Sequence, residues 1–262
     1  MVSVVSKFFT LFIFLLFSLL YIKPLAAAPA RIAIVIDDIG YRETDKHALT
    51  LPGEITYSIL PHTPYGKKLA LQAHAQHKDV LLHIPMEAEN GKKLGPGALT
   101  SKMNETQIVN SLSASFAEIP FAIGINNHMG SYLTQLSDPM TWTMNFLKQH
   151  HLLFLDSKTS PKSKAENIAK KLGVPVKHRY IFLDNQLTQA YINKQFQLLI
   201  NYAKNQKFAI AIAHPHPETM IALQQLIPTL SAHNIQLVSL SSLYPTKTIL
   251  TKNNNTKLTT QN

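Results

Sequence analysis

The chain has 262 residues, of which 45% are hydrophobic and 15% charged, so it can bury a sizeable core, and a disordered or coiled-coil protein is excluded. It contains no cysteine, which excludes a disulfide scaffold, a cysteine-ligated metal and a cysteine nucleophile. The formal net charge is +10, but no basic stripe interleaved with aromatic residues is present, so a nucleic-acid partner is not expected.

Residues 1–28 have the features of a secretory signal peptide. Lys7 precedes an uncharged run over 8–22 that is rich in Phe and Leu, and the small residues Ala26–Ala28 follow. The apolar run is shorter than the roughly 20 residues that span a bilayer. An uncleaved membrane anchor is the alternative, because Pro29 hinders cleavage directly before it. We therefore expect a periplasmic or secreted protein, with peripheral association to an anionic envelope through its mildly basic surface.

Short apolar runs alternate with helical patterns through residues 29–245, and a polar tail over 246–262 is predicted to be disordered. The runs are continuously apolar, which is typical of parallel strands buried on both faces. The strands are predicted at 31–36, 55–60, 79–84, 122–125, 152–155, 179–183, 208–213 and 236–240. Seven to eight such strands, linked by helices and lacking a phosphate-binding glycine fingerprint, favour a single (β/α) barrel domain over a doubly wound sheet.

Helical patterns fill most of the intervals between these strands. The clearest start follows Asn104, which with Gln107 forms a predicted capping box. Gly173 is predicted to end another helix. The remaining helices are predicted within 63–76, after Asp138-Pro139, around 192–199 and around 220–227.

Polar residues stand at the carboxyl ends of the predicted strands. In a parallel barrel these ends meet at one mouth, where carboxylates and His are the parts of a hydrolytic metal site. The residues in question are Asp37, Asp38, His62, His83, His128, Asp156, Asp184, His214 and His216.

Some of these residues have a simpler explanation. Asp156 and Asp184 could cap the turns that follow them, and His62 lies between two Pro in a predicted surface loop. The neighbouring carboxylates of Asp37 and Asp38 are harder to explain in this way. After an apolar strand such a pair is unfavourable unless it shares a cation or a proton.

Four motifs together resemble the divergent polysaccharide deacetylase family, which is related to the NodB-like carbohydrate esterases. They are Ile36-Asp37-Asp38-Ile39-Gly40, His83-Ile84-Pro85-Met86-Glu87, Asn127-His128-Met129-Gly130-Ser131 and His214-Pro215-His216. The resemblance covers about 31–244 and implies a distorted (β/α) barrel that holds a divalent metal, usually zinc.

The resemblance also implies roles for single residues, with departures from the usual pattern. Where the related esterases have two metal-binding His four apart, this chain has His83 and Glu87, and His128 lies where an Arg-x-Pro motif is expected. Either the metal shell is rebuilt or the ancestral chemistry is lost. In the rebuilt site Asp38, His83 and His128 bind zinc, Asp37 is the base, His214 is the acid, and Glu87, Asp156 and His216 bind substrate or orient these groups.

The function expected from this resemblance is removal of acetyl groups from an envelope or extracellular glycan, with the acetylated glycan as partner. Two alternatives stay open. One is a carbohydrate-binding or envelope-assembly protein that has kept the barrel and lost turnover, and the other is a different metal-dependent hydrolase on the same scaffold.

Overall fold

The computed structural model describes residues 28–244, so the expected signal segment and polar tail lie outside the described residues, except for Ala28. Within this range, no helix is long and apolar enough to cross a membrane. The strands are β1 (Ala30–Ile39), β2 (Ile55–Ile59), β3 (Val80–Met86), β4 (Gly124–Met129), β5 (Leu153–Asp156), β6 (Val176–His178), β7 (Ile181–Phe182), β8 (Phe208–Ala213) and β9 (Ile235–Leu237).

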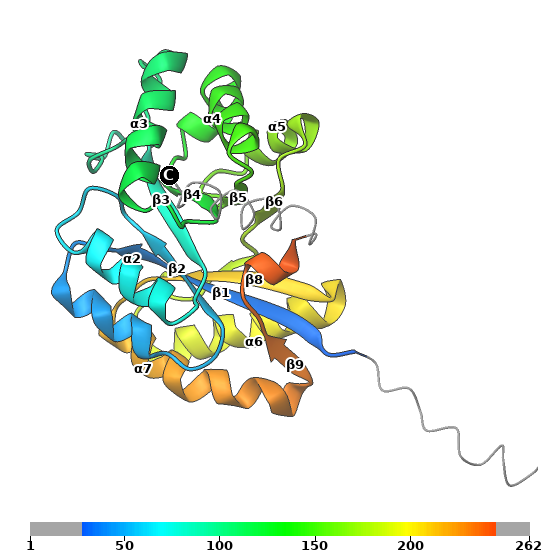
Figure 1. The fold of residues 1–262 in the computed structure, drawn as a ribbon. Coiled ribbons are helices and arrows are strands. Elements are labelled where there is room, and N and C mark those ends of the chain that lie inside the picture. Colours follow the sequence, from blue (N-terminus) through cyan, green and yellow to red (C-terminus); the bar gives the residue numbers. More distant parts are fainter. Residues whose placement is uncertain (1–27, 245–262) are drawn as a thin grey trace, which may run out of the picture.

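Helices connect most consecutive strands (Figure 1). The α-helices are α2 (Gly66–Ala75), α3 (Glu105–Glu118), α4 (Ser137–Gln149), α5 (Ala165–Leu172), α6 (Gln189–Gln206) and α7 (Pro217–Leu226). The 3-10 helices are η1 (Glu43–Thr50), η2 (Leu133–Gln135), η3 (Ile227–His233) and η4 (Ser241–Leu243). The capping box of Asn104 and Gln107 and the left-handed Gly173 at the end of α5 are both present, as predicted.

The strands form one parallel sheet in the order β6-β5-β4-β3-β2-β1-β8-β7, and β9 pairs with the first residues of β1. The order starts at β6 and ends at β7, so within residues 28–244 the sheet curls without closing. In Figure 1, α3, α4 and α5 cover one part of the outer surface, and α6 and α7 cover another. The distorted (β/α) barrel predicted from the sequence is confirmed.

One predicted strand is shorter in the structure, and one strand was not predicted. The run 179–183 was expected to be a single strand, but only Ile181–Phe182 forms β7, at one edge of the sheet. β6 lies at the other edge, pairs with β5, and had not been predicted. Its residues Val176–His178 are half-buried and include Lys177, so they lack the continuous apolar run by which the other strands were identified.

Alternate residues of each strand face the two sides of the sheet, and this alternation determines which residues reach the mouth. In β1, Ile32, Ile34 and Ile36 belong to the large core beneath the helices, whereas Ala33 and Val35 belong to a smaller core inside the barrel. Asp37 is the next inward position after Val35. The other strands repeat this pattern, with inward apolar residues followed by an inward polar residue at the mouth: Leu81 then His83, Leu155 then Ser157, and Ile212 then His214.

Candidate metal centre

A β-bulge brings both carboxylates of the Asp37-Asp38 pair to the mouth. Ile36 pairs with Tyr57 and Ile39 pairs with Ile59, so two residues of β1 stand opposite one residue of β2. Asp38 has φ 60°, a left-handed conformation that a residue other than Gly adopts infrequently. In a regular strand, neighbouring side chains point to opposite faces, so only one of the two carboxylates would reach the mouth. Here β1 continues to Ile39, and the bulge turns Asp38.

The loop after β1 is held close to the mouth by Gly40 and Asp45. Gly40 has φ 138°, and a Cβ atom there would lie 2.2 Å from Oγ1 of Thr63, so no other residue fits without movement. The buried Oδ2 of Asp45 accepts hydrogen bonds from the N–H groups of Gly40, at 2.9 Å, and Arg42, at 3.1 Å. This loop therefore fixes the position of Asp38 from the carboxyl side.

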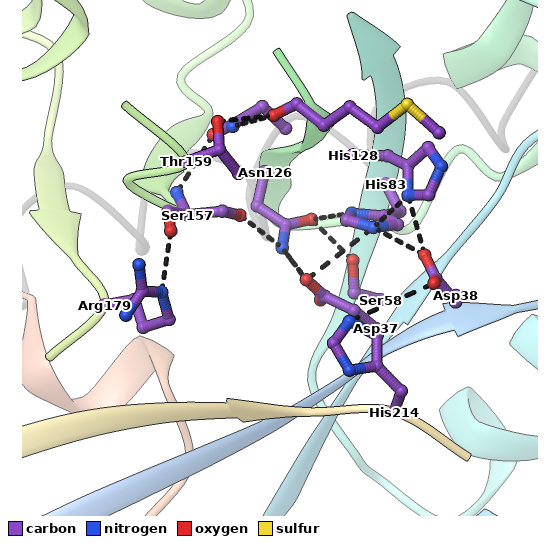
Figure 2. Close-up of polar contacts among 12 residues, drawn as sticks. Asp37, Asp38, Ser58, His83, Asn126, His128, Ser157, Thr159, Arg179 and His214 are labelled. Atoms are coloured by element: carbon purple, nitrogen blue, oxygen red, sulfur yellow. Dashed lines mark hydrogen bonds and ion pairs between the residues drawn. The ribbon is translucent and has the colours of Figure 1, made fainter. Parts of the chain in front are cut away.

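Asp38, His83 and His128 place three ligand atoms around one point (Figure 2). Oδ1 of Asp38 lies 3.0 Å from Nε2 of His83 and 2.7 Å from Nδ1 of His128, and the two imidazole nitrogens are 3.2 Å apart. Oδ1 is buried and makes no hydrogen bond of regular geometry, although two ring nitrogens face it. One carboxylate oxygen and two imidazole nitrogens are a typical donor set for a catalytic divalent ion such as zinc, so these residues fit the metal that the resemblance implies.

The charges in this cluster favour a cation at the same point. Burial disfavours the charged form of His83, but the carboxylates of Asp37 and Asp38 outweigh it and raise the pKa of His83. Burial would raise the pKa of Asp38, but the close ring nitrogens of His128 and His83 hold it well below its ordinary value. The mouth therefore carries an anionic pair that two protons or one divalent cation can neutralise.

Asn126 joins Asp37 to His83, and it was not among the site residues predicted from the sequence. Its Oδ1 accepts from Nδ1 of His83 at 2.8 Å and from the Ser58 hydroxyl at 2.5 Å, while its Nδ2 donates to the two carboxylate oxygens of Asp37 at 2.8 and 3.0 Å (Figure 2). Since Oδ1 of Asn126 is an acceptor, it favours a hydrogen on Nδ1 of His83, so that Nε2 is the ring nitrogen that can bind a cation. Asn126 thus contacts both His83 and Asp37 and orients the two side chains together.

Asp37 lies behind the three ligand atoms and is nearly inaccessible to solvent. Burial raises the pKa of its carboxyl, against the lowering effects of His83, His214 and Asn126. Its Oδ2 is 3.6 Å from Nε2 of His83. A carboxylate with a raised pKa beside a potential metal is suited to accept a proton from water.

His214 reaches the same mouth from the end of β8, and Asp184 orients its ring. Nδ1 of His214 lies 3.0 Å from Oδ1 of Asp184, whose Oδ2 accepts from the backbone N–H of His214 and from the hydroxyl of Thr219. Nε2 of His214 faces Asp38 at 4.0 Å. Burial would lower the pKa of His214, but Asp184 reverses this and raises it to about 9.

The His214–Asp184 pair predicts a pH-dependent stability. Because the folded-state pKa of His214 is raised from 6.5 to about 9, this stabilisation is fully present below pH 6.5 and is lost as the pH rises through 9. We expect the free energy of unfolding to fall by roughly 2 kcal/mol over this window. Denaturant unfolding at pH 6 and pH 9.5 measures the change, and Asp184→Asn should remove most of it. An equal fall in that variant would show that other groups cause it.

The three residues expected to bind substrate or to orient these groups have other partners. Oε2 of Glu87 accepts from the N–H of Ser101 at 2.5 Å, and the carboxylate of Asp156 accepts from the N–H of Lys158 and the hydroxyl of Ser163. Asp156 therefore caps the turn after β5, the alternative considered for it. His216 precedes α7, with its ring centroid 6.1 Å from that of His214. Asp184 makes the contact that orients the ring of His214, a role that had been expected of Asp156 or His216.

His62 lies outside the cluster. Its Nδ1 is 2.8 Å from Oε2 of Glu118 and its Nε2 is 3.3 Å from Oγ of the buried Ser115, both on α3. Arg179 holds the loop after β5 by donating to the carbonyls of Ser157 and Lys158. Burial lowers the pKa of Arg179 to about 10, and the nearby carboxylates of Asp156 and Asp37 oppose this lowering.

Comparison with known proteins agrees with this architecture. The family model for divergent polysaccharide deacetylases matches residues 34–244. An uncharacterized protein of Haemophilus influenzae is 37% identical over 238 residues, which cover 90% of this chain and 85% of that protein. An uncharacterized protein of Agrobacterium tumefaciens, whose structure is solved, has a TM-score of 0.79 at 26% identity and covers 83% of this chain and 90% of its own.

A more distant likeness concerns the fold alone. The catalytic domain of a peptidoglycan N-acetylglucosamine deacetylase from Eubacterium rectale has a TM-score of 0.50 at 12% identity, covering 85% of this chain and 96% of that one.

Proposed function

Because this chain belongs to the divergent polysaccharide deacetylase family, we propose that it is a metal-dependent hydrolase that removes acetyl groups from a glycan. One observation supports this most directly: the three ligand atoms of Asp38, His83 and His128 meet beside a buried carboxylate, Asp37, whose orientation is fixed by a separate residue. A potential metal site and a potential base thus occupy one mouth.

The residues around the mouth have complementary tasks in such a reaction. A divalent ion such as zinc, when held by Asp38, His83 and His128, supplies Lewis acidity toward an acetyl carbonyl and makes water a stronger acid. Asp37 accepts the proton of the attacking water, and its raised pKa makes it a stronger base than an exposed Asp. Asn126 keeps the Asp37 carboxylate directed at the mouth through two hydrogen bonds.

His214 supplies the proton that the leaving group needs. When the bond between the acetyl carbon and the glycan nitrogen or oxygen breaks, the departing amine or alcohol accepts a proton from Nε2 of His214. Asp184 raises the pKa of His214 to about 9, so the ring carries this proton at neutral pH. The water proton on Asp37 and the proton lost by His214 balance the reaction, whose products are acetate and the deacetylated glycan.

Acetate release tests the proposal. Purified protein is stripped of metal, reloaded with zinc, and incubated with N-acetylated chito-oligosaccharides and with peptidoglycan fragments. We expect acetate from at least one substrate with zinc and none after chelation. If zinc-loaded protein bound these glycans but released no acetate from them or from O-acetylated forms, the alternative of a binding or assembly protein would replace the enzyme.

We also propose that the protein acts outside the cytoplasm, on the basis of the segment around Lys7 and Ala26–Ala28. Cleavage of a signal peptide would leave a mature amino terminus near Ala28. Amino-terminal sequencing of protein extracted from the cell envelope measures this directly. A sequence that starts at Met1 in the membrane fraction would support the anchor instead, and one that starts at Met1 in the cytoplasm would contradict export.

A further inference from the structure

A groove between η1 and α7 lies next to the ends of the two strands that lead to Asp38 and His214. η1 follows β1, which carries Asp37 and Asp38, and α7 follows β8, which leads to His214. The groove has a volume of about 510 Å³, which lies within the range of small-molecule sites. Its lining includes Arg42, four residues after Asp38, and Pro215, directly after His214. Because β1 and β8 pair side by side, with Ile36 opposite Ala213, these lining residues follow two neighbouring strand ends at the mouth.

The two walls of the groove differ in chemistry. The η1 wall presents Arg42, Thr44 and His47, which can donate hydrogen bonds, and its lining contains no acidic residue. The α7 wall presents Met220 and Ile221 beside one polar residue, Gln224, and Ile221 is 55% exposed in spite of its apolar side chain. A sugar ring has C–H groups on its faces and hydroxyls at its edge, so it complements one apolar and one polar wall.

An ion pair with Asp45 restrains the guanidinium of Arg42 at the edge of the groove. The carboxylate of Asp45 is almost fully buried and lies 3.4 Å from Nε of Arg42, while the Arg42 side chain is 56% exposed. The contact through Nε leaves the two terminal nitrogens of the guanidinium for a ligand. A guanidinium fixed in this way can bind a carboxylate through two parallel hydrogen bonds.

We propose that this groove binds a carboxylate-bearing sugar of the same glycan chain, next to the acetylated sugar at the metal centre. The inference rests on the proposed function for the position of the acetylated sugar, and it adds the substrate class. Arg42 pairs with the carboxylate, and Ile221 contacts the apolar face of the ring. The enzyme would thus prefer acidic glycans over neutral chains of N-acetylglucosamine.

Calorimetric binding to defined oligosaccharides tests the groove without depending on turnover. The whole chain carrying Asp37→Asn is titrated with a peptidoglycan tetrasaccharide that contains N-acetylmuramic acid, and with the same tetrasaccharide after reduction of its carboxyl groups to alcohols. A uronate-containing tetrasaccharide provides a second source of carboxylate, and chitotetraose is the neutral comparison. We expect the intact acidic peptidoglycan fragment to bind about tenfold more tightly than its reduced form, the usual contribution of a charge-assisted hydrogen bond. Tight binding of the uronate oligomer instead would identify that source of the carboxylate.

Variants with matched controls locate the effect. Arg42→Ala and Arg42→Gln should abolish the preference for the carboxylate, whereas Lys46→Ala, which removes an exposed charge from η1 outside the groove lining, should leave it intact. Ile221→Ser should weaken binding of both forms, whereas Leu198→Ser, an exposed apolar residue of α6, should not. Circular dichroism confirms that each variant is folded.

Either of two binding results would overturn the proposal. One is equal affinity for the acidic and reduced oligosaccharides, and the other is a preference for the acidic form that survives in both Arg42 variants. These outcomes are separate from the proposed function. If the wild-type protein released acetate and Arg42→Ala had an unchanged KM for the acidic oligosaccharide, the groove proposal would be wrong and the deacetylase proposal would stand. If the protein preferred the carboxylate-bearing oligosaccharide but released no acetate, the groove proposal would be supported and the deacetylase proposal would be wrong.

Discussion

Replacing Asp37 with Asn should lower turnover by about 10²- to 10⁴-fold while zinc stays bound, because this is the usual contribution of a general base. Asp37 is not one of the three residues whose ligand atoms converge, and its Oδ2 lies 3.6 Å from the nearest ring nitrogen of His83. The side chain of Asn has the same shape but cannot accept the proton of the attacking water. Zinc content by mass spectrometry and acetate release are measured on the same preparation.

Asp38→Asn is the matched partner of this variant, because it makes the same change one residue further along the chain. Here zinc occupancy should fall by 10-fold or more, and activity should fall with it, since a neutral amide is a much poorer ligand than a carboxylate. If Asp37→Asn lost its metal and Asp38→Asn kept it, the two roles would be reversed. If neither variant changed zinc content or acetate release, the metal-dependent mechanism would be wrong.

The second large effect is expected at Asn126. Asn126→Ala leaves Nδ1 of His83, the hydroxyl of Ser58 and the carboxylate of Asp37 without their shared partner in a fully buried position. Each buried group left unpaired costs about 1–3 kcal/mol, so the free energy of unfolding should fall by roughly 3 kcal/mol or more. Zinc affinity should fall by about 10- to 100-fold, because His83 loses the contact that sets its tautomer. Denaturant unfolding and zinc titration give the two values.

Asn126→Asp separates the two functions of this residue. The new side chain keeps an acceptor for His83 but places an oxygen where Nδ2 had donated to Asp37 at 2.8 Å. We expect zinc binding to be retained and turnover to be lost, because two carboxylates at this distance share a proton and Asp37 is no longer a free base. Asn110→Ala, at an exposed position of α3, is the control and should change neither property. Unchanged turnover in Asn126→Asp would show that Asp37 does not depend on this contact.

The alternation of strands and helices predicted most of the fold because each buried strand is a continuous apolar run. The interval 208–213 coincides with β8, for example, and Asn104 caps α3 as expected. β6 was missed because Lys177 and half-buried neighbours interrupt the apolar pattern at the sheet edge. Its pairing with β5 depends on tertiary contacts that no local sequence signal reports.

The candidate site was predictable where its residues are ionisable and less so where they are not. Asp38, His83 and His128 were expected to converge because each stands near the end of a parallel strand, and the structure brings them together. Asn126 and Ser58 are neutral, so they did not stand out beside the acids and histidines. Counting in steps of two along β4 would have found Asn126, because it shares the inward face with Gly124 and His128.

Two further features depend on backbone geometry that the sequence does not reveal. The left-handed conformation of Asp38 and the bulge opposite Ser58 allow both carboxylates to reach the mouth without ending β1. Asp184 was considered both as a mouth residue and as a turn cap, and its contact with His214 depends on the approach of the loop after β7 to the end of β8. Neither arrangement follows from residue spacing alone.

The most direct test of a metal centre formed by Asp38, His83 and His128 is the position of zinc in crystals of the zinc-loaded protein. An anomalous difference map recorded at the zinc absorption edge locates the ion without reference to activity. We expect one strong peak about 2.0–2.2 Å from Oδ1 of Asp38, Nε2 of His83 and Nδ1 of His128. A peak coordinated by His214 or His62 in place of these residues, or no peak at the mouth after zinc loading, would show that these three residues do not form the metal centre.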